Sequence, residues 1–234
     1  MAREGSPGLD TVLMDAFGTL LYLEPPGPRL AAELERRLGA PVSETAATAA
    51  FAAEIAYYLD HHLEGRDARS LAELRERCAE VIRASLRLPE QAHAAVREAM
   101  LEAIAFTAYP EAARALAELR AGGVRLVAAS NWDCSLAEVL DRVGLGEALD
   151  AVVPSALVGA PKPDPRLFAT ALDAVGAQAS RSIHVGDSIE HDVAGARAAG
   201  LRAVLVVRGA TRPSGAGVPV VSSLAALPSL VFGA

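Results

Sequence analysis

Lysine is almost absent from this chain of 234 residues. Lys162 is the single lysine among 22 basic residues, and Asn131 is the single asparagine. Biased codon usage can produce such scarcity, so scarcity alone proves nothing. A compact ammonium nevertheless fits places that a wide planar guanidinium does not. Where a chain rich in arginine keeps one lysine, that lysine becomes a candidate for a specific chemical role.

The chain also lacks the features of several protein classes. No run of about 18 apolar residues occurs, so we expect no membrane span. The net charge of −7 and pI of about 5.3 argue against a general nucleic-acid surface. The first ten residues contain no apolar signal segment, and Cys78 and Cys134 form no CxxC pair. We therefore expect a cytoplasmic protein with a small-molecule substrate, and leave a homodimer open.

Short apolar, β-branched runs alternate with helical patterns in residues 1–23 and 108–234. This alternation predicts βαβ units around a buried parallel sheet, the α/β class with a Rossmann-like three-layer core. The predicted strands are 11–15, 124–130, 150–154, 182–186, 203–207 and a short one near 218–221. The predicted helices are 110–121, 135–143, 165–175 and 192–199, and 209–217 is predicted to be a loop.

Residues 24–107 have a different pattern. They are rich in Ala, Leu, Glu and Arg at helical spacing, with breaks at 39–41, at Gly65 and at Pro89. We expect an all-helical cap domain, inserted between the first strand and the rest of the core. Its ends, the segments PPGPR (25–29) and TAYP (107–110), are predicted to be linkers.

Polar residues follow the strands of the predicted core. Asp15 ends the first strand, Ser130 and Asn131 end the second, and Asp187 follows the strand 182–186, with Asp192 five residues further on. Lys162 lies in the loop GAPKPDPRLF before a predicted helix. Because ligands of open α/β sheets bind at the carboxyl ends of the strands, these side chains are expected to converge.

The set has a chemical logic. Asp15 can act as a nucleophile that forms a covalent intermediate. Asp15 and Asp187 can together hold Mg²⁺, which prefers a few carboxylates plus waters, and Asp192 is a further candidate ligand. Lys162 can neutralise the transferring group, and Ser130 can bind its oxygens. This is the combination of positioning and electrostatics that phosphoryl transfer needs.

The four segments DAFGTL, ASNWD, GAPKPDPRLF and HVGDSIEHDVAGARAAG, in this order, resemble the four motifs of the haloacid dehalogenase (HAD) superfamily. The helical insert resembles the cap of its first subfamily, which includes phosphatases and L-2-haloacid dehalogenases. The resemblance implies that Asp15 is the nucleophile and that Ser130 binds the substrate anion. It further implies that Lys162 stabilises the intermediate, and that Asp187, Asp192 and the backbone carbonyl of Phe17 complete a Mg²⁺ site.

Phe17 departs from the phosphatases of this family. They usually carry a second Asp there, which protonates the leaving group and then activates water, a contribution of about 10²–10⁴-fold. Dehalogenases of the family have an aromatic residue at this position, because halide needs no proton to leave. They lack the acidic pair that this chain has as Asp187 and Asp192, and they work without metal. Because three carboxylates repel one another without a cation, we give the acidic motif more weight.

The sequence therefore predicts a Mg²⁺-dependent phosphatase that acts on a small phosphorylated metabolite through an aspartyl-phosphate on Asp15. The alternatives are a metal-independent 2-haloacid dehalogenase and a non-catalytic or weakly active binding protein. Three residues keep more than one interpretation. Asp192 could simply cap the helix that follows it, Asn131 could brace its loop rather than bind substrate, and His191 could be a substitute acid. His184, inside a strand, is expected to be structural.

Overall fold

The computed structural model describes residues 8–39, 41–209 and 217–233. By its internal contacts the chain divides into two compact units, residues 23–107 and residues 1–22 with 108–234. Most of the predicted loop 209–217 lies outside the described residues. Among those residues, no helix combines the length and the apolar character that a membrane crossing needs.

A six-stranded sheet forms the centre of the larger unit, and its described pairings are all parallel, as predicted. The strand order is β5-β4-β1-β6-β7-β8. The strands are β1 (Thr11–Met14), β4 (Arg125–Ser130), β5 (Ala151–Pro154), β6 (Ser182–Gly186), β7 (Arg202–Val206) and β8 (Val220–Val221). The chain builds outward from β1 first on the β4 side and then on the β6 side. The end of β1 is therefore the point where the strand order reverses, which is where ligands of such sheets bind.

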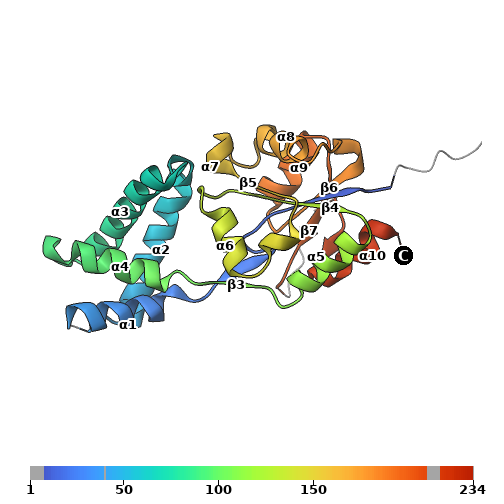
Figure 1. Cartoon of the computed structure of the whole chain (residues 1–234). Helices are drawn as coiled ribbons and strands as arrows, with labels where there is room; N and C mark the ends of the chain where they lie inside the picture. The colour runs from blue at the N-terminus through green and yellow to red at the C-terminus, as the bar shows by residue number, and fades with distance from the viewer. Residues whose placement is uncertain (1–7, 40, 210–216, 234) are drawn as a thin grey trace, which may run out of the picture. The chain divides into compact units, whose positions relative to one another are not determined.

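Helices cover both faces of this sheet (Figure 1). Helices α8 (Pro165–Asp173) and α9 (Gly195–Ala198) lie on one face, and α5 (Ala112–Ala121) and α10 (Leu227–Phe232) lie on the other. Helices α6 (Leu136–Arg142) and α7 (Ser155–Val158) flank β5. Apolar side chains of β1, β4 and α8, among them Leu13, Val127 and Phe168, are fully buried between sheet and helices. The α/β class and the layered core are thus confirmed.

One helix prediction was wrong in its start. The segment predicted as a helix over 192–199 begins at Ile189, and Ile189–Ala194 is a π-helix that continues into α9. Ser188 precedes it as the N-cap, and its Oγ accepts a hydrogen bond from the backbone N–H of His191. The capping interpretation of Asp192 was therefore wrong as well, because Asp192 lies inside the helix.

Residues 23–107 form a helical unit with its own core. Its helices are α1 (Pro26–Leu38), α2 (Glu44–His61), α3 (Ala68–Ser85) and α4 (His93–Ala103), with short 3₁₀ turns at His62–Glu64 and Glu90–Ala92. Buried apolar side chains from all four helices form the core, including Leu34, Phe51, Leu74, Ile82 and Met100. The breaks at Gly65 and Pro89 are confirmed. The first break is also confirmed, since Gly39 ends α1 with a left-handed backbone, φ 67°.

The two ends of this insert are not plain linkers, contrary to our prediction. Strands β2 (Leu21–Leu23) and β3 (Phe106–Ala108) pair with each other as a two-stranded sheet. The segment PPGPR supplies the first turn of α1 instead of a loop, because proline is tolerated in a first helical turn, where its missing N–H has no partner to lose. Three-residue strands are too short to show a period of two, so the sequence pattern missed them.

Candidate active site

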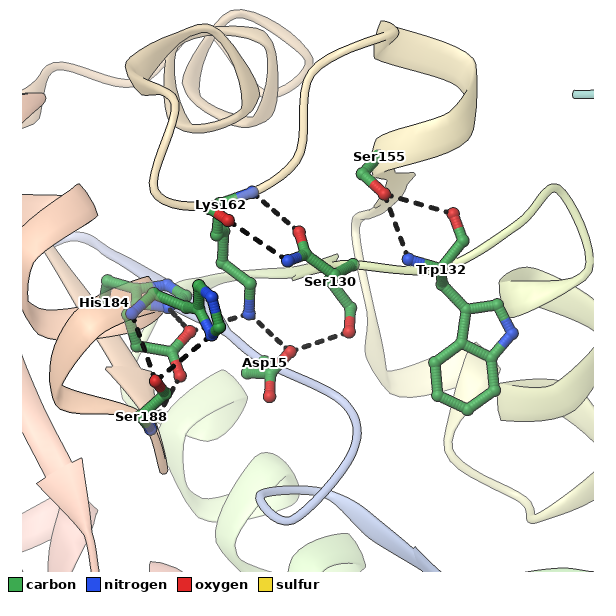
Figure 2. A network of polar contacts seen from close by, with 10 residues as sticks. Asp15, Ser130, Trp132, Ser155, Lys162, His184 and Ser188 are labelled. Atoms are coloured by element: carbon green, nitrogen blue, oxygen red, sulfur yellow. Dashed lines mark hydrogen bonds and ion pairs between the residues drawn. The ribbon is translucent and has the colours of Figure 1, made fainter. Parts of the chain in front are cut away.

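The end of β1 places Asp15 at the centre of a polar cluster in the larger unit (Figure 2). The backbone N–H of Asp15 donates to the carbonyl of Val185 on β6 at 2.9 Å, which continues the sheet by one residue. The residue is only 6% exposed. A carboxylate so buried needs hydrogen-bond or ionic partners. Its partners are residues that the sequence predicted to converge here.

Two donors converge on one oxygen of Asp15. Ser130 Oγ donates to Asp15 Oδ1 at 2.7 Å, and Lys162 Nζ donates to the same oxygen at 2.5 Å. Among the described residues, the other oxygen, Oδ2, accepts no hydrogen bond from the protein. Oδ1 is thus held in place, and Oδ2 is the oxygen available to attack a substrate.

Asn131 brings the lysine loop to the end of β4. Its Oδ1 accepts from the backbone N–H of Lys162 at 2.7 Å, and its Nδ2 donates to the Lys162 carbonyl at 3.2 Å. This reciprocal pair fixes the backbone from which the only lysine extends. The arrangement is the bracing role that the sequence had left open, while substrate binding by Asn131 stays a prediction.

Three protein groups contact the carboxylate of Asp192. Its Oδ1 accepts from Lys162 Nζ at 2.7 Å and lies 2.8 Å from His184 Nε2, and its Oδ2 accepts from the backbone N–H of Ser188 at 2.9 Å. Both Lys162 and Asp192 are at least 96% buried. The ammonium therefore lies between two carboxylates, Asp15 and Asp192, each held by further donors.

Asp187 is the exposed member of the acidic group. One oxygen from each of Asp15, Asp187 and Asp192 lies within 4.8 Å of the others. In the part of the chain that the structure describes, Asp187 forms no ion pair within 4 Å, whereas the other two share Lys162. A donor set made of oxygens, with one carboxylate left without a cation, fits a hard divalent ion such as Mg²⁺.

Glycine lets the turn after Asp15 approach Asp187. Gly18 has a positive φ of 75°, and a Cβ at that position would lie 2.0 Å from Asp187 Oδ2. A pocket of about 590 Å³ opens beside this contact and is lined by Gly18, Tyr109, Asp187, Ile189 and residues 205–208. Open space therefore borders the carboxylate that has no cation.

The electrostatics follow from three carboxylates facing one ammonium. Burial raises the pKa of Asp15, although Lys162 acts in the opposite direction. Partial burial and the like charges of Asp15 and Asp192 raise the pKa of Asp187 to about 6. Burial also disfavours the charge on Asp192, but Lys162 and His184 outweigh it and lower the pKa of Asp192. Lys162 stays charged because the two carboxylates raise its pKa against the effect of burial.

Phe17 lies in the turn that follows Asp15 and is 49% exposed. Its phenyl ring cannot donate or accept a proton. His191, considered as a substitute acid, is exposed and contacts Ser188, with Nδ1 at 3.3 Å from Ser188 Oγ. In the described residues no contact links His191 to Asp15, so the described geometry gives no support to that role.

Sequence reasoning missed the contacts that Arg208 and His184 make in this region. Arg208, after β7, donates to the carbonyls of Gly18 and Thr19 and stacks on the ring of Tyr109, 3.2 Å from its centroid. His184, expected to be structural, contacts Asp192 directly. A histidine inside an otherwise apolar strand was the signal for the second. No sequence signal separates Arg208 from the other 20 arginines.

Comparison with known proteins decides the family. A family model described as a haloacid dehalogenase-like hydrolase matches residues 9–200. The chain belongs to the haloacid dehalogenase-like hydrolases. The match covers the segments that contain Asp15, Ser130, Lys162, Asp187 and Asp192, together with the helical insert. This HAD hydrolase thus belongs to the superfamily that its four motifs indicated, and its insert lies between β1 and β4, as in the first subfamily.

The relatives of this HAD hydrolase include both phosphatases and dehalogenases. It is 42% identical over 122 residues to a phosphoserine phosphatase of Thermus thermophilus, covering 52% of this chain and 49% of that protein. It is 42% identical over 87 residues to the haloacid dehalogenase-like hydrolase domain-containing protein 3 of Bos taurus, covering 37% of this chain and 35% of that protein. These matches span half or less of each curated relative.

A solved structure matches nearly the full chain. The L-2-haloacid dehalogenase from Xanthobacter autotrophicus is 25% identical, with a TM-score of 0.67, over 96% of this chain and 99% of that one. The HAD phosphatase from Thermococcus onnurineus matches over the same shares, with a TM-score of 0.65 and 24% identity. The second likeness shows the fold alone.

Proposed function

We propose that this HAD hydrolase is a Mg²⁺-dependent phosphatase that acts on small phosphorylated molecules with good leaving groups. The observation that carries the proposal is the grouping of one oxygen each of Asp15, Asp187 and Asp192 within 4.8 Å of one another, with a single ammonium that pairs with Asp15 and Asp192. Three ionised carboxylates and one lysine leave an excess of negative charge, which a divalent cation offsets. An anionic substrate also needs that offset to approach Asp15.

In the first step Asp15 Oδ2 attacks the phosphorus atom. A bond forms between Oδ2 and phosphorus, the bond from phosphorus to the leaving oxygen breaks, and that oxygen keeps the electron pair. Lys162 and Ser130, which hold Oδ1, keep the carboxylate oriented for attack. The product is an aspartyl-phosphate on Asp15.

In the second step water attacks the same phosphorus atom. The bond between Asp15 and phosphorus breaks, inorganic phosphate leaves, and the carboxylate is restored. The described site contains no protonated carboxyl at position 17 to assist either step, since that residue is Phe17. Leaving groups that depart as stable anions, such as those of acyl and aryl phosphates, need no proton and are therefore the expected substrates.

The metal would be held by Asp15 and Asp187, with the carbonyl of Phe17 as a further ligand by family resemblance. When bound, it would offset the charge of the transferring phosphoryl group. Asp192 was predicted as a ligand as well. Because its oxygens already meet Lys162, His184 and the backbone of Ser188, we assign it instead to holding Lys162 in place.

Hydrolysis of an aryl phosphate, measured with and without Mg²⁺, tests this function. The expected result is turnover that needs Mg²⁺ and falls by at least about 10³-fold in Asp15→Asn, because the amide is not a nucleophile. Asn also keeps an oxygen to accept from Ser130 and Lys162, so the fold should survive the change. Equal turnover in Asp15→Asn and wild type would overturn the assignment of the nucleophile.

A metal-independent 2-haloacid dehalogenase is the second candidate. Two observations favour it, the exposed aromatic ring of Phe17 and the likeness in fold to the Xanthobacter dehalogenase. In that reaction Asp15 Oδ2 would attack the carbon that carries the halogen, and halide would leave with the electron pair. Chloride release from 2-chloropropionate, unaffected by a chelator, would select this candidate over the phosphatase.

A further inference from the structure

The proposed function makes no use of His184, although this residue is fully buried beside the site. His184 is a side chain of β6, two residues before Gly186, so the two residues face the same side of the strand. Asp192 lies against both. Its Oδ1 is 2.8 Å from His184 Nε2, and a Cβ at Gly186 would lie 2.1 Å from its Cγ. Only glycine at 186 leaves room for Asp192 to reach the histidine.

The surroundings of the imidazole fix its proton. Nδ1 is buried and has no hydrogen-bond partner in the part of the chain that the structure describes. A proton on Nδ1 would therefore be a buried donor without an acceptor, which is unfavourable. The neutral ring with its proton on Nε2 avoids this cost, and in that form Nε2–H donates to Asp192 Oδ1.

The ring plane is fixed as well. The edge of one ring meets the face of the other between His184 and Phe168, with centroids 5.0 Å apart and an angle of 90°. His184 therefore presents one donor, in one direction, to an oxygen that it shares with Lys162 Nζ. This oxygen is one of the two that hold the ammonium.

We propose that His184 is a positioning residue, which holds Asp192 so that Asp192 in turn holds Lys162 against Asp15. The inference rests on the proposed role of Lys162 beside the nucleophile. Residues that orient metal ligands typically change activity by about 10–100-fold when removed, and we expect an effect of the same order for a residue that orients the partner of Lys162. A plain packing role for His184 would need the ring but not the donor, and the two are separable by substitution.

Three variants separate the ring from the donor. His184→Gln places an amide N–H near the position of Nε2 and so keeps the donor while losing the ring. His184→Asn places its amide near Nδ1, where no partner lies. His184→Phe keeps a flat ring against Phe168 and removes the donor. Under the proposal, Gln is the mildest change, and Asn and Phe both lower kcat by about tenfold with little change in KM.

The single lysine provides a readout that needs no substrate. Labelling the chain with ¹⁵N-lysine gives one side-chain Nζ signal, that of Lys162. The buried, ion-paired ammonium should exchange its protons slowly with water in wild type and in His184→Gln. In His184→Asn and His184→Phe the signal should move and its exchange should quicken, because Asp192 has lost a donor.

The outcomes are distinct. Unchanged Nζ signals and equal kcat in all four proteins would overturn the proposal. A loss of kcat that parallels the loss of thermal stability, with His184→Gln as impaired as His184→Phe, would overturn it as well. Should His184→Phe fail to fold, the Gln and Asn pair decides, because both are amides. A wild type without phosphatase activity would remove the proposed function, while the Nζ signals would still decide whether His184 positions Lys162.

Discussion

Phe17→Asp should raise activity on phosphates with poor leaving groups. The ring is half exposed, so its removal leaves little cavity, and position 17 lies in the turn directly after the nucleophile. A carboxyl here would supply the proton donor that the site lacks. General acid–base catalysis contributes about 10²–10⁴-fold, which corresponds to about 2.7–5.5 kcal/mol of barrier.

The gain should depend on the leaving group. An alkyl phosphate expels a basic alkoxide and needs the full proton transfer, so its hydrolysis should rise by about 10²–10⁴-fold. An aryl phosphate expels a stable anion and should gain less than about tenfold. The assay is kcat/KM over a series of phosphates whose leaving groups differ in pKa. Wild type should show a steep dependence on that pKa, and the variant a shallow one.

Phe17→Asn is the matched control, because it has the size of Asp and no acid. It should leave the steep dependence of wild type in place. Equal gains in Asn and Asp would mean that the ring merely blocked the site. If kcat/KM of Phe17→Asp does not rise for any phosphate at saturating Mg²⁺, the missing acid does not limit turnover.

Three further predictions test the site. Lys162→Arg should lower kcat by about 10²–10³-fold, because a guanidinium does not fit where Nζ lies 2.5 Å from Asp15 Oδ1 and 2.7 Å from Asp192 Oδ1. Circular dichroism should show that the variant is folded. A kcat near that of wild type would contradict this prediction. Gly18 and Gly144 share a φ of 75°, so Gly18→Ala and Gly144→Ala should each lower the free energy of unfolding by about 1–2 kcal/mol in chemical denaturation. Only Gly18→Ala, whose new Cβ meets Asp187, should lose Mg²⁺-dependent activity. The pKa of Asp187 in the folded protein, about 6, lies above the ordinary 3.8, so its contribution to stability is complete below about pH 4 and is lost as the pH rises through 6. Mg²⁺ competes with that proton and should raise Tm by about 2–4 °C more at pH 8 than at pH 5; equal shifts would argue against Asp187 as a ligand.

The sequence predicted the sheet and the convergence of its strand ends for a physical reason. Parallel strands buried on both faces are continuous apolar runs, and polar residues directly after such runs stand out. Asp15 and Asp187 directly follow strands of this kind, and Ser130 ends another. The scarcity of lysine then singled out Lys162, which the structure places 2.5 Å from Asp15.

Other features left no readable signal. The strands β2 and β3 are three residues long, too short for a periodic pattern. The π-helix at 189–194 is capped by Ser188, and no apolar spacing marks it. Arg208 acts through its contacts with the carbonyls of Gly18 and Thr19, and a residue that recognises backbone carries no motif. Contacts between distant segments decide the pairing of β2 with β3 and the position of Arg208.

Two assays on the same protein distinguish a Mg²⁺-dependent phosphatase from a metal-independent dehalogenase. One measures phosphate release from an aryl phosphate with Mg²⁺ and then with excess chelator, and the other measures chloride release from 2-chloropropionate. We predict phosphate release that stops with the chelator and is absent in Asp15→Asn, without chloride release. Chloride release that persists in the chelator, with no phosphate release at any Mg²⁺ concentration, would contradict it.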